Sequence, residues 1–120
     1  MARPLILVVE DDLLVRLNTA EIFVEAGFEI IEAGDAVAAL AMLKEKPGIR
    51  LVCTDVHMPG EQDGIDLAMN LREHHPDIKV IVVSGDRGIR ALPPTIPFLP
   101  KPFLSARLVE VAREQLSAPG

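Results

Sequence analysis

The sequence has little cysteine, no excess of basic residues and no long apolar run. Its single cysteine, Cys53, cannot form an internal disulfide, and its place in an apolar stretch favours a buried side chain over a reactive thiol. The net charge of −6 argues against binding to a nucleic-acid backbone. No apolar run approaches the roughly 20 residues of a membrane-spanning helix, and residues 1–9 lack a signal-peptide pattern. We therefore expect a cytoplasmic protein that contacts neither nucleic acid nor membrane.

What the chain does have is enough apolar material for one folded domain. Of its 120 residues 49% are hydrophobic, a share that excludes a disordered chain. The length suits one domain that buries a core without disulfides or structural metals. No repeat, linker or low-complexity stretch interrupts the sequence, so we expect residues 1–120 to form a single domain.

Apolar runs alternate with helical patterns along the chain. Leu5–Val9 is continuously apolar, which is typical of a central parallel strand covered on both faces. The clearest helix follows Asp35, a candidate N-cap, and ends before Pro47. In total we expect strands over residues 5–9, 28–31, 51–54, 79–83 and 98–99, and helices over residues 13–26, 36–46, 64–74 and 105–116. This alternation predicts an α/β fold with a doubly wound, five-stranded parallel sheet in the flavodoxin-like strand order 2-1-3-4-5.

The stretch between Ser84 and Lys101 breaks the alternation. It contains prolines at positions 93, 94, 97 and 100 together with two glycines. Proline removes a backbone donor and clashes with the preceding helical turn. We therefore expect at most one turn around residues 89–92, so that a fourth helix is shortened or absent.

Acidic and polar side chains follow three of the predicted strands. They are Glu10, Asp11 and Asp12 after the first strand, Asp55 after the third, and Ser84 and Asp86 after the fourth. Ligands of open α/β sheets bind at the carboxyl ends of the strands, so these groups should meet at one edge. Mg²⁺ suits them because it keeps several waters and needs only one or two carboxylates, whereas Ca²⁺ needs six to eight oxygens. The alternative is an acidic loop that is merely solvated.

Asp55 and Lys101 supply two groups that phosphoryl transfer needs beside a cation. A carboxylate next to a metal can attack phosphorus and form an aspartyl phosphate, the role we expect for Asp55. Lys101 is flanked by two prolines and could act as a point charge on phosphate oxygens, while the Ser84 hydroxyl could hydrogen-bond one of them. The alternatives are a solvated lysine and a turn serine.

Four motifs, in order, resemble the receiver domain of two-component response regulators. They are Val8–Asp12, Asp55–Gly60, Ser84–Gly85 and Phe98–Phe103. Together they span nearly the whole chain at compatible spacing. The resemblance implies that a sensor histidine kinase or a phosphotransfer protein donates a phosphoryl group, which then switches a protein-binding surface.

The resemblance also implies a role for each site residue. Asp55 is the phosphoacceptor, Glu10 and Asp11 are the acidic pair, and Lys101 contacts the phosphate. Mg²⁺ would be held by Asp11, Asp55 and the main-chain carbonyl of His57, with Glu10 acting through water. The Lys101–Pro102 bond is cis in this family, in agreement with the reduced cost of a cis bond before proline.

The resemblance further identifies a switch and two tuning positions. Ser84 occupies the hydroxyl position that moves inward on phosphorylation, and Phe98 matches the aromatic residue that rotates into the vacated space. His57 and Asp86 lie two positions beyond the acceptor and the hydroxyl, where family members tune dephosphorylation. The alternative is that both are ordinary solvated loop residues.

The sequence departs from the family pattern in two loops and at its C-terminal end. The loop after Pro59 is one residue longer, and the segment before Phe98 is several residues shorter. The shorter segment puts the usual partner surface and the usual dimer in doubt, so we expect a monomer or a weak dimer. We expect no output domain after the last predicted helix. Met1 and the short tail favour a complete stand-alone receiver that acts as a relay, a sink or a protein-binding switch.

Two other classes of protein fit parts of the pattern. One is an interaction module that keeps the fold but never accepts phosphate, which the altered segment before Phe98 leaves open. The other is an aspartate-nucleophile phosphohydrolase similar to the haloacid dehalogenases. Those enzymes carry a second acid two residues after the nucleophile, and here that position is His57. We therefore expect no enzyme beyond the chain's own phosphorylation and dephosphorylation chemistry.

Overall fold

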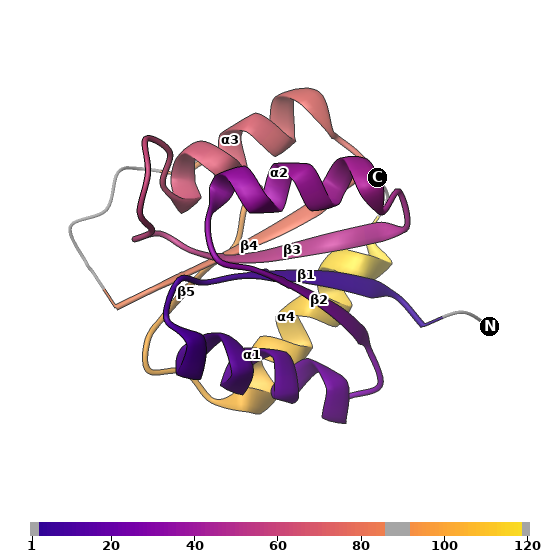
Figure 1. Ribbon diagram of the computed structural model, residues 1–120. Helices are drawn as coiled ribbons and strands as arrows, with labels where there is room; N and C mark the ends of the chain where they lie inside the picture. The colour runs from indigo at the N-terminus through magenta and orange to yellow at the C-terminus, as the bar shows by residue number, and fades with distance from the viewer. Residues whose placement is uncertain (1–2, 86–91, 119–120) are drawn as a thin grey trace.

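The computed structural model describes residues 3–85 and 92–118 (Figure 1). Strands and helices alternate from the start of the chain. Their bounds are β1 (Leu5–Val9), α1 (Leu13–Glu25), β2 (Glu29–Ala33), α2 (Ala36–Glu45), β3 (Ile49–Asp55), α3 (Gly64–His74), β4 (Lys79–Ser84), β5 (Phe98–Pro100) and α4 (Ser105–Ser117). No helix in this part of the chain is long and apolar enough to cross a membrane.

The five strands form one parallel sheet in the order β2-β1-β3-β4-β5. β1 lies between β2 and β3, as its continuous apolar run predicts. The short β5 pairs only with β4 and forms one edge of the sheet. The predicted α/β fold and the predicted strand order are therefore confirmed.

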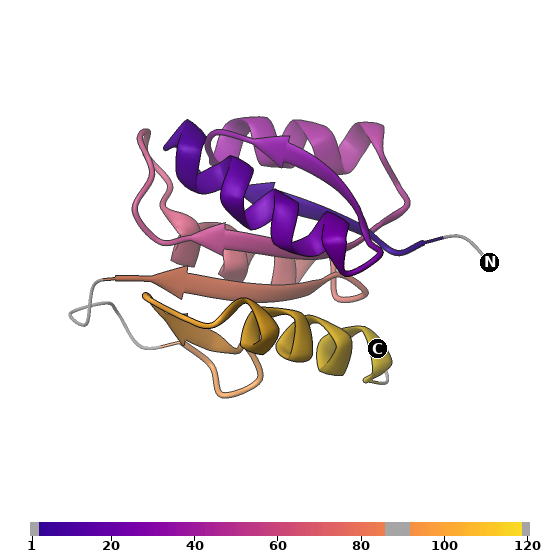
Figure 2. The same cartoon turned by 90° about the horizontal axis from the view of Figure 1, so that it is seen from below.

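Each face of the sheet has its own core. In β1, Leu7 and Val9 point into the cluster under α2 and α3, whereas Ile6 and Val8 point into the cluster under α1 and α4. Figure 2 shows α1 and α4 side by side across the second face. Because both faces are covered, all four of these strand side chains are buried.

The helix bounds agree closely with the sequence-based prediction, and the differences have local causes. Asp35 caps α2 by accepting from the N–H of Ala38 at 2.8 Å. The second strand, expected over residues 28–31, instead runs over Glu29–Ala33. Phe28 belongs to the preceding turn, where its N–H donates to the carbonyl of Phe23 and the two rings meet edge to face.

Residues 92–97, which the structure describes before β5, contain no helix. The part of the chain that is described therefore has four helices, and none of them lies between β4 and β5. This agrees with the expected loss or shortening of a helix in the proline-rich stretch. The single turn expected around residues 89–92 lies almost wholly outside the described residues.

Candidate functional site

The carboxyl ends of β1, β3, β4 and β5 lie together at one end of the sheet, which we call its carboxyl edge to distinguish it from the edge strands β2 and β5. Asp55 is the last residue of β3 and Ser84 the last of β4, while Glu10 and Lys101 directly follow β1 and β5. The main chain joins two of these ends, because the N–H of Lys101 donates to the carbonyl of Ser84 at 2.9 Å. Parallel pairing thus brings together side chains that are up to 91 positions apart in the sequence.

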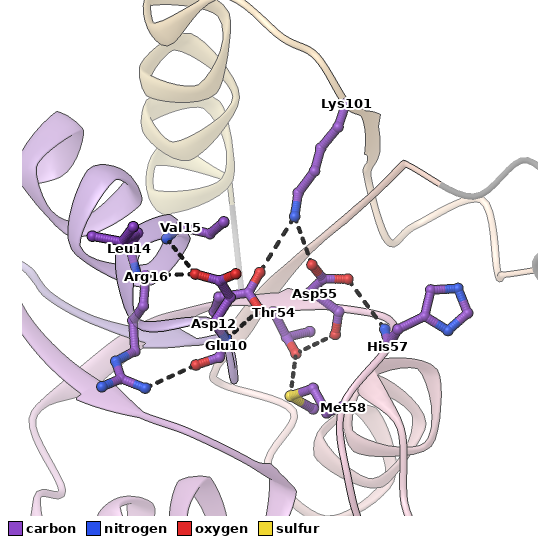
Figure 3. A network of polar contacts seen from close by, with 10 residues as sticks. All are labelled: Glu10, Asp12, Leu14, Val15, Arg16, Thr54, Asp55, His57, Met58 and Lys101. Carbon is purple, nitrogen blue, oxygen red and sulfur yellow. Dashed lines mark hydrogen bonds and ion pairs between the residues drawn. The ribbon is translucent and has the colours of Figure 1, made fainter.

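Lys101 lies between two carboxylates at this edge. Its Nζ is 2.6 Å from Oδ2 of Asp55 and 3.3 Å from Oε1 of Glu10 (Figure 3). The side chains of Asp55 and Glu10 are only 12% and 7% exposed, whereas that of Lys101 is 27% exposed. The Lys101–Pro102 peptide bond is cis, as the family resemblance implies.

The two carboxyl groups have opposite pKa shifts. Burial raises the pKa of Glu10 to about 7, and the hydrogen bond with Asp55 acts in the same direction. Burial alone would also raise the pKa of Asp55, but the hydrogen bonds with Glu10 and Lys101 outweigh it and lower that pKa. Burial would lower the pKa of Lys101, but the Asp55 carboxylate raises it. Asp55 and Lys101 therefore carry opposite charges at neutral pH.

Asp55 is also held by the loop that follows it. Its Oδ1 accepts from the N–H of His57 at 3.1 Å, while the exposed imidazole of His57 points away from the carboxylates (Figure 3). Both oxygens of the Asp55 carboxylate thus have a donor. A main-chain donor of this kind, together with Lys101, fixes the direction of the carboxylate.

The oxygen-rich edge fits the chemistry of Mg²⁺ better than that of a metal held by many side chains. Glu10 and Asp55 supply carboxylates, and the exposed Asp11 directly follows Glu10 in the loop after β1. Within residues 3–85 and 92–118 no three or more His, Cys, Asp or Glu side chains are grouped to hold a metal ion. Mg²⁺ needs no such group, because main-chain carbonyls, waters and phosphate oxygens complete its octahedron.

Three further residues were predicted to belong to the site, namely Ser84, Phe98 and Asp86. The side chain of Ser84 is buried next to the Lys101 main chain, and Phe98 is half-buried in β5, where it pairs in register with Val82. Asp86 lies outside the described residues. The sequence-based prediction missed Arg16, which donates from Nη1 to the carbonyl of Glu10 at 3.0 Å. An arginine in the first turns of a helix carries no signal by itself that could have identified this contact.

Comparison with known proteins decides the family. The model of the response regulator receiver domain matches residues 6–113 of this chain. The chain belongs to this family. The prediction made from its four motifs is therefore confirmed.

Individual relatives agree with this assignment. The chain is 40% identical over 117 residues to sensor kinase CckA of Brucella abortus, covering 92% of this chain and 12% of CckA. It is 31% identical to response regulator receiver protein CpdR of the same organism, covering 94% of this chain and 97% of CpdR. The chain thus spans a small part of CckA and, at 25%, of the transcriptional regulator NtrC of Azospirillum brasilense, but nearly all of CpdR.

Solved structures show the same fold. A receiver protein from Sinorhizobium medicae superposes with a TM-score of 0.86 at 28% identity, covering 97% of this chain and 96% of that one. The receiver domain of the hybrid histidine kinase CckA gives a TM-score of 0.79 at 34% identity, covering 94% and 99% of the two chains. The chain is accordingly a phosphoacceptor receiver of two-component signalling. Receivers as a family bind Mg²⁺ at the phosphorylation site and interact with histidine kinases or phosphotransfer proteins.

Proposed function

We propose that Asp55 accepts the phosphoryl group from a phosphohistidine of a sensor histidine kinase or a phosphotransfer protein. The observation that supports this most directly is the 2.6 Å contact between Asp55 Oδ2 and Lys101 Nζ at the carboxyl edge of the sheet. The low pKa of Asp55, which hydrogen bonds with Glu10 and Lys101 maintain against the effect of burial, keeps it an ionised nucleophile at neutral pH.

In the transfer step an Asp55 carboxylate oxygen forms a bond to phosphorus. The phosphorus–nitrogen bond of the donor breaks, and its electron pair returns to the imidazole. Lys101 then moves its hydrogen bond from the Asp55 carboxylate to a phosphoryl oxygen, and the N–H of His57 keeps the acceptor oriented. Mg²⁺, held by Asp11, Asp55 and the main-chain carbonyl of His57 with Glu10 acting through water, would neutralise charge on the phosphoryl oxygens.

The phosphoryl group is proposed to reach a partner surface through Ser84 and β5. The Ser84 hydroxyl would turn toward the phosphoryl oxygens, and Phe98 would rotate into the space it leaves. The proposal is supported by main-chain contacts that connect Ser84 to β5. Ser84 accepts from the Lys101 N–H at 2.9 Å and pairs with Pro100, two residues beyond Phe98. A two-state rearrangement along this path alters the surface that a partner protein binds.

The test is phosphorylation by acetyl phosphate in the presence of Mg²⁺, read by intact-protein mass spectrometry. The wild type should gain the mass of one phosphoryl group and should fail to do so when EDTA is added. Asp55→Asn should remain folded, because the change is small and lies at the rim of the sheet, and should gain no mass. An adduct on the folded Asp55→Asn protein would refute the assignment of the acceptor.

The same experiment separates two other functions. If the wild type forms no adduct with acetyl phosphate or with a phosphorylated histidine-containing transfer protein, and binds no Mg²⁺, the chain is an interaction module. Steady release of phosphate from added phosphomonoesters would instead indicate a phosphohydrolase. The haloacid dehalogenases carry a second acid two residues after the nucleophile, where this chain has His57 with its imidazole turned away.

A further inference from the structure

Arg16, in the first turns of α1, joins the loop after β1 to the end of β2. Its Nη1 donates to the main-chain carbonyl of Glu10 at 3.0 Å (Figure 3). Its Nε donates to Oε1 of Glu32 at 3.0 Å. The side chains of Arg16 and Glu32 are only 20% and 31% exposed, so solvent screens the pair incompletely. A guanidinium suits this place because its rigid fork can bind a carboxylate and a carbonyl at once.

Glu10 is held through nearly all of its polar atoms. Its N–H donates to the carbonyl of Ala33 at 3.0 Å, and its own carbonyl accepts from Arg16. Its Oε2 accepts from the N–H of Asp12 at 3.0 Å. Its Oε1 accepts from Nζ of Lys101 at 3.3 Å. The direction of this carboxylate is therefore set by the main chain around it, which Arg16 holds on one side.

The contact with Arg16 also bears on Asp11. The Glu10 carbonyl belongs to the peptide group that joins Glu10 to Asp11, so the guanidinium restrains the rotation of that peptide plane. On its other side Asp11 is followed by Asp12, which caps α1 by accepting from the N–H groups of Leu14 and Val15 at 2.9 and 3.2 Å. The main chain is therefore restrained on both sides of Asp11, by the Arg16 contact before it and by the Asp12 cap after it.

We propose that Arg16 is a positioning residue for Mg²⁺, which it would serve by fixing the backbone that presents Glu10 and Asp11. The inference rests on the proposed function of this edge. Arg16 does not donate to a carboxylate of the edge itself, so it would act through the main chain. Outer-shell groups that orient metal ligands commonly change metal affinity by about 10- to 100-fold.

The test compares Arg16→Gln with the wild type by titration calorimetry with Mg²⁺. The variant should bind Mg²⁺ about tenfold more weakly, at the lower end of the range for outer-shell groups. In acetyl phosphate assays the Mg²⁺ concentration for half-maximal rate should rise by a similar factor. The maximal rate at saturating Mg²⁺ should stay within about threefold of the wild type, because the acceptor and Lys101 are unchanged. Arg16→Lys, which keeps one donor, should recover part of the affinity.

Arg113→Gln is the matched control. Arg113 also donates to a main-chain carbonyl next to α1, that of Ala26 at 2.9 Å, and its guanidinium lies over the Phe28 ring. It sits at the opposite end of α1 from the acidic loop. Arg113→Gln should lower thermal stability but leave Mg²⁺ affinity unchanged. If it weakened Mg²⁺ binding as much as Arg16→Gln, the effect would be general loosening of α1 and the proposal would be wrong.

Amide hydrogen exchange without Mg²⁺ gives a readout that needs no metal. In Arg16→Gln the amides of Glu10 and Asp12, which donate to Ala33 and to Glu10 Oε2, should exchange faster than global destabilisation accounts for. Unchanged exchange at both amides would overturn the proposal. Failure of the wild type to accept phosphate would refute the proposed acceptor, while this comparison would still decide the role of Arg16.

Discussion

Lys101 contacts two acids whose pKa values are shifted in opposite directions. It is 2.6 Å from Asp55, whose pKa is lowered although burial alone would raise it, and 3.3 Å from Glu10, whose pKa burial raises to about 7. The lowered pKa favours the ionised form of Asp55, whereas the raised pKa favours protonation of Glu10 as the pH falls. This division leaves Asp55 in the state that the proposed nucleophile needs.

The raised pKa of Glu10 predicts that Mg²⁺ binding depends on pH. Below pH 7 the cation must displace a proton from Glu10, so affinity should fall as the pH falls through this value. For one proton the dissociation constant should be about tenfold higher at pH 6 than at pH 8. Calorimetry in buffers of different ionisation heat would measure both the affinity and the released proton. Glu10→Gln should bind more weakly and lose the pH dependence, and equal wild-type affinity at the two pH values would contradict the prediction.

Lys101→Ala should separate phosphorylation from its structural response. The variant keeps Asp55, so acetyl phosphate should still modify it, but no cation remains at that position to link the phosphoryl group to β5. We expect the amide chemical shifts of Phe98–Pro100 to change on phosphorylation of the wild type and to change little in Lys101→Ala. Lys44→Ala, an exposed lysine of α2, serves as the control and should respond as the wild type does. A normal response of β5 in Lys101→Ala would show that the lysine has no such role.

Among individual residues, the sequence predicts the contacts of Lys101 with the two acids but not those of Arg16. The meeting of Glu10, Asp55 and Lys101 follows from parallel pairing, because each residue lies at or just after the carboxyl end of a strand. The contacts of Arg16 depend instead on how α1 is turned on the sheet. Apolar residues occur on several sides of α1, and Leu14 is 74% exposed, so the sequence pattern could not decide that rotation.

Among the elements, α3 approaches β3 so closely that its first residue has no room for a side chain. The N–H of Gly64 donates to the carbonyl of Val56 at 2.8 Å. A Cβ on Gly64 would lie 1.8 Å from the main-chain oxygen of Asp55 and 3.0 Å from Oγ1 of Thr54. The distance between α3 and β3 is therefore set by this glycine.

Gly64→Ala should accordingly destabilise the protein and disturb the site. Backbone atoms rather than a flexible side chain must move, so we expect the free energy of unfolding to fall by about 2 kcal/mol or more. The rate of phosphorylation by acetyl phosphate should fall as well, since the displaced carbonyl is that of Asp55. Gly48→Ala, where a Cβ would meet nothing within 4 Å, should change stability by no more than about 0.5 kcal/mol. Equal stability of the two variants in urea would refute this view of the α3–β3 contact.

The elements could be predicted where their ends carry strong local signals. The start of α2 after Asp35 and the start of α3 at Gly64 agree with the sequence-based bounds. The predicted bounds of β2, residues 28–31, were wrong at both ends, because Phe28 belongs to the preceding turn and the strand continues through Glu32 to Ala33. β2 is an edge strand, and there Glu32 can leave the core and pair with Arg16.

At the scale of the whole molecule, the carboxyl edge of the sheet is connected to both cores. β1 and β3 deliver Glu10 and Asp55, and side chains of the same two strands alternate between the cluster under α2 and α3 and the cluster under α1 and α4. A domain of this size is expected to unfold as one cooperative unit. The binding free energy of a ligand at the carboxyl edge should therefore raise the free energy of unfolding of the entire domain rather than stabilise one loop.

Mg²⁺ should raise the global stability by the amount that mass action requires. At a free Mg²⁺ concentration 100 times the dissociation constant the gain is about 2.7 kcal/mol. The sequence contains no tryptophan or tyrosine, so urea unfolding is best followed by far-ultraviolet circular dichroism. We expect the urea midpoint of the wild type to rise with Mg²⁺ while the slope stays constant, because the surface exposed on unfolding is unchanged. In Asp55→Asn, which loses one carboxylate of the site, the gain at the same Mg²⁺ concentration should be smaller. An equal gain in the two proteins would place the stabilising cation elsewhere on the molecule.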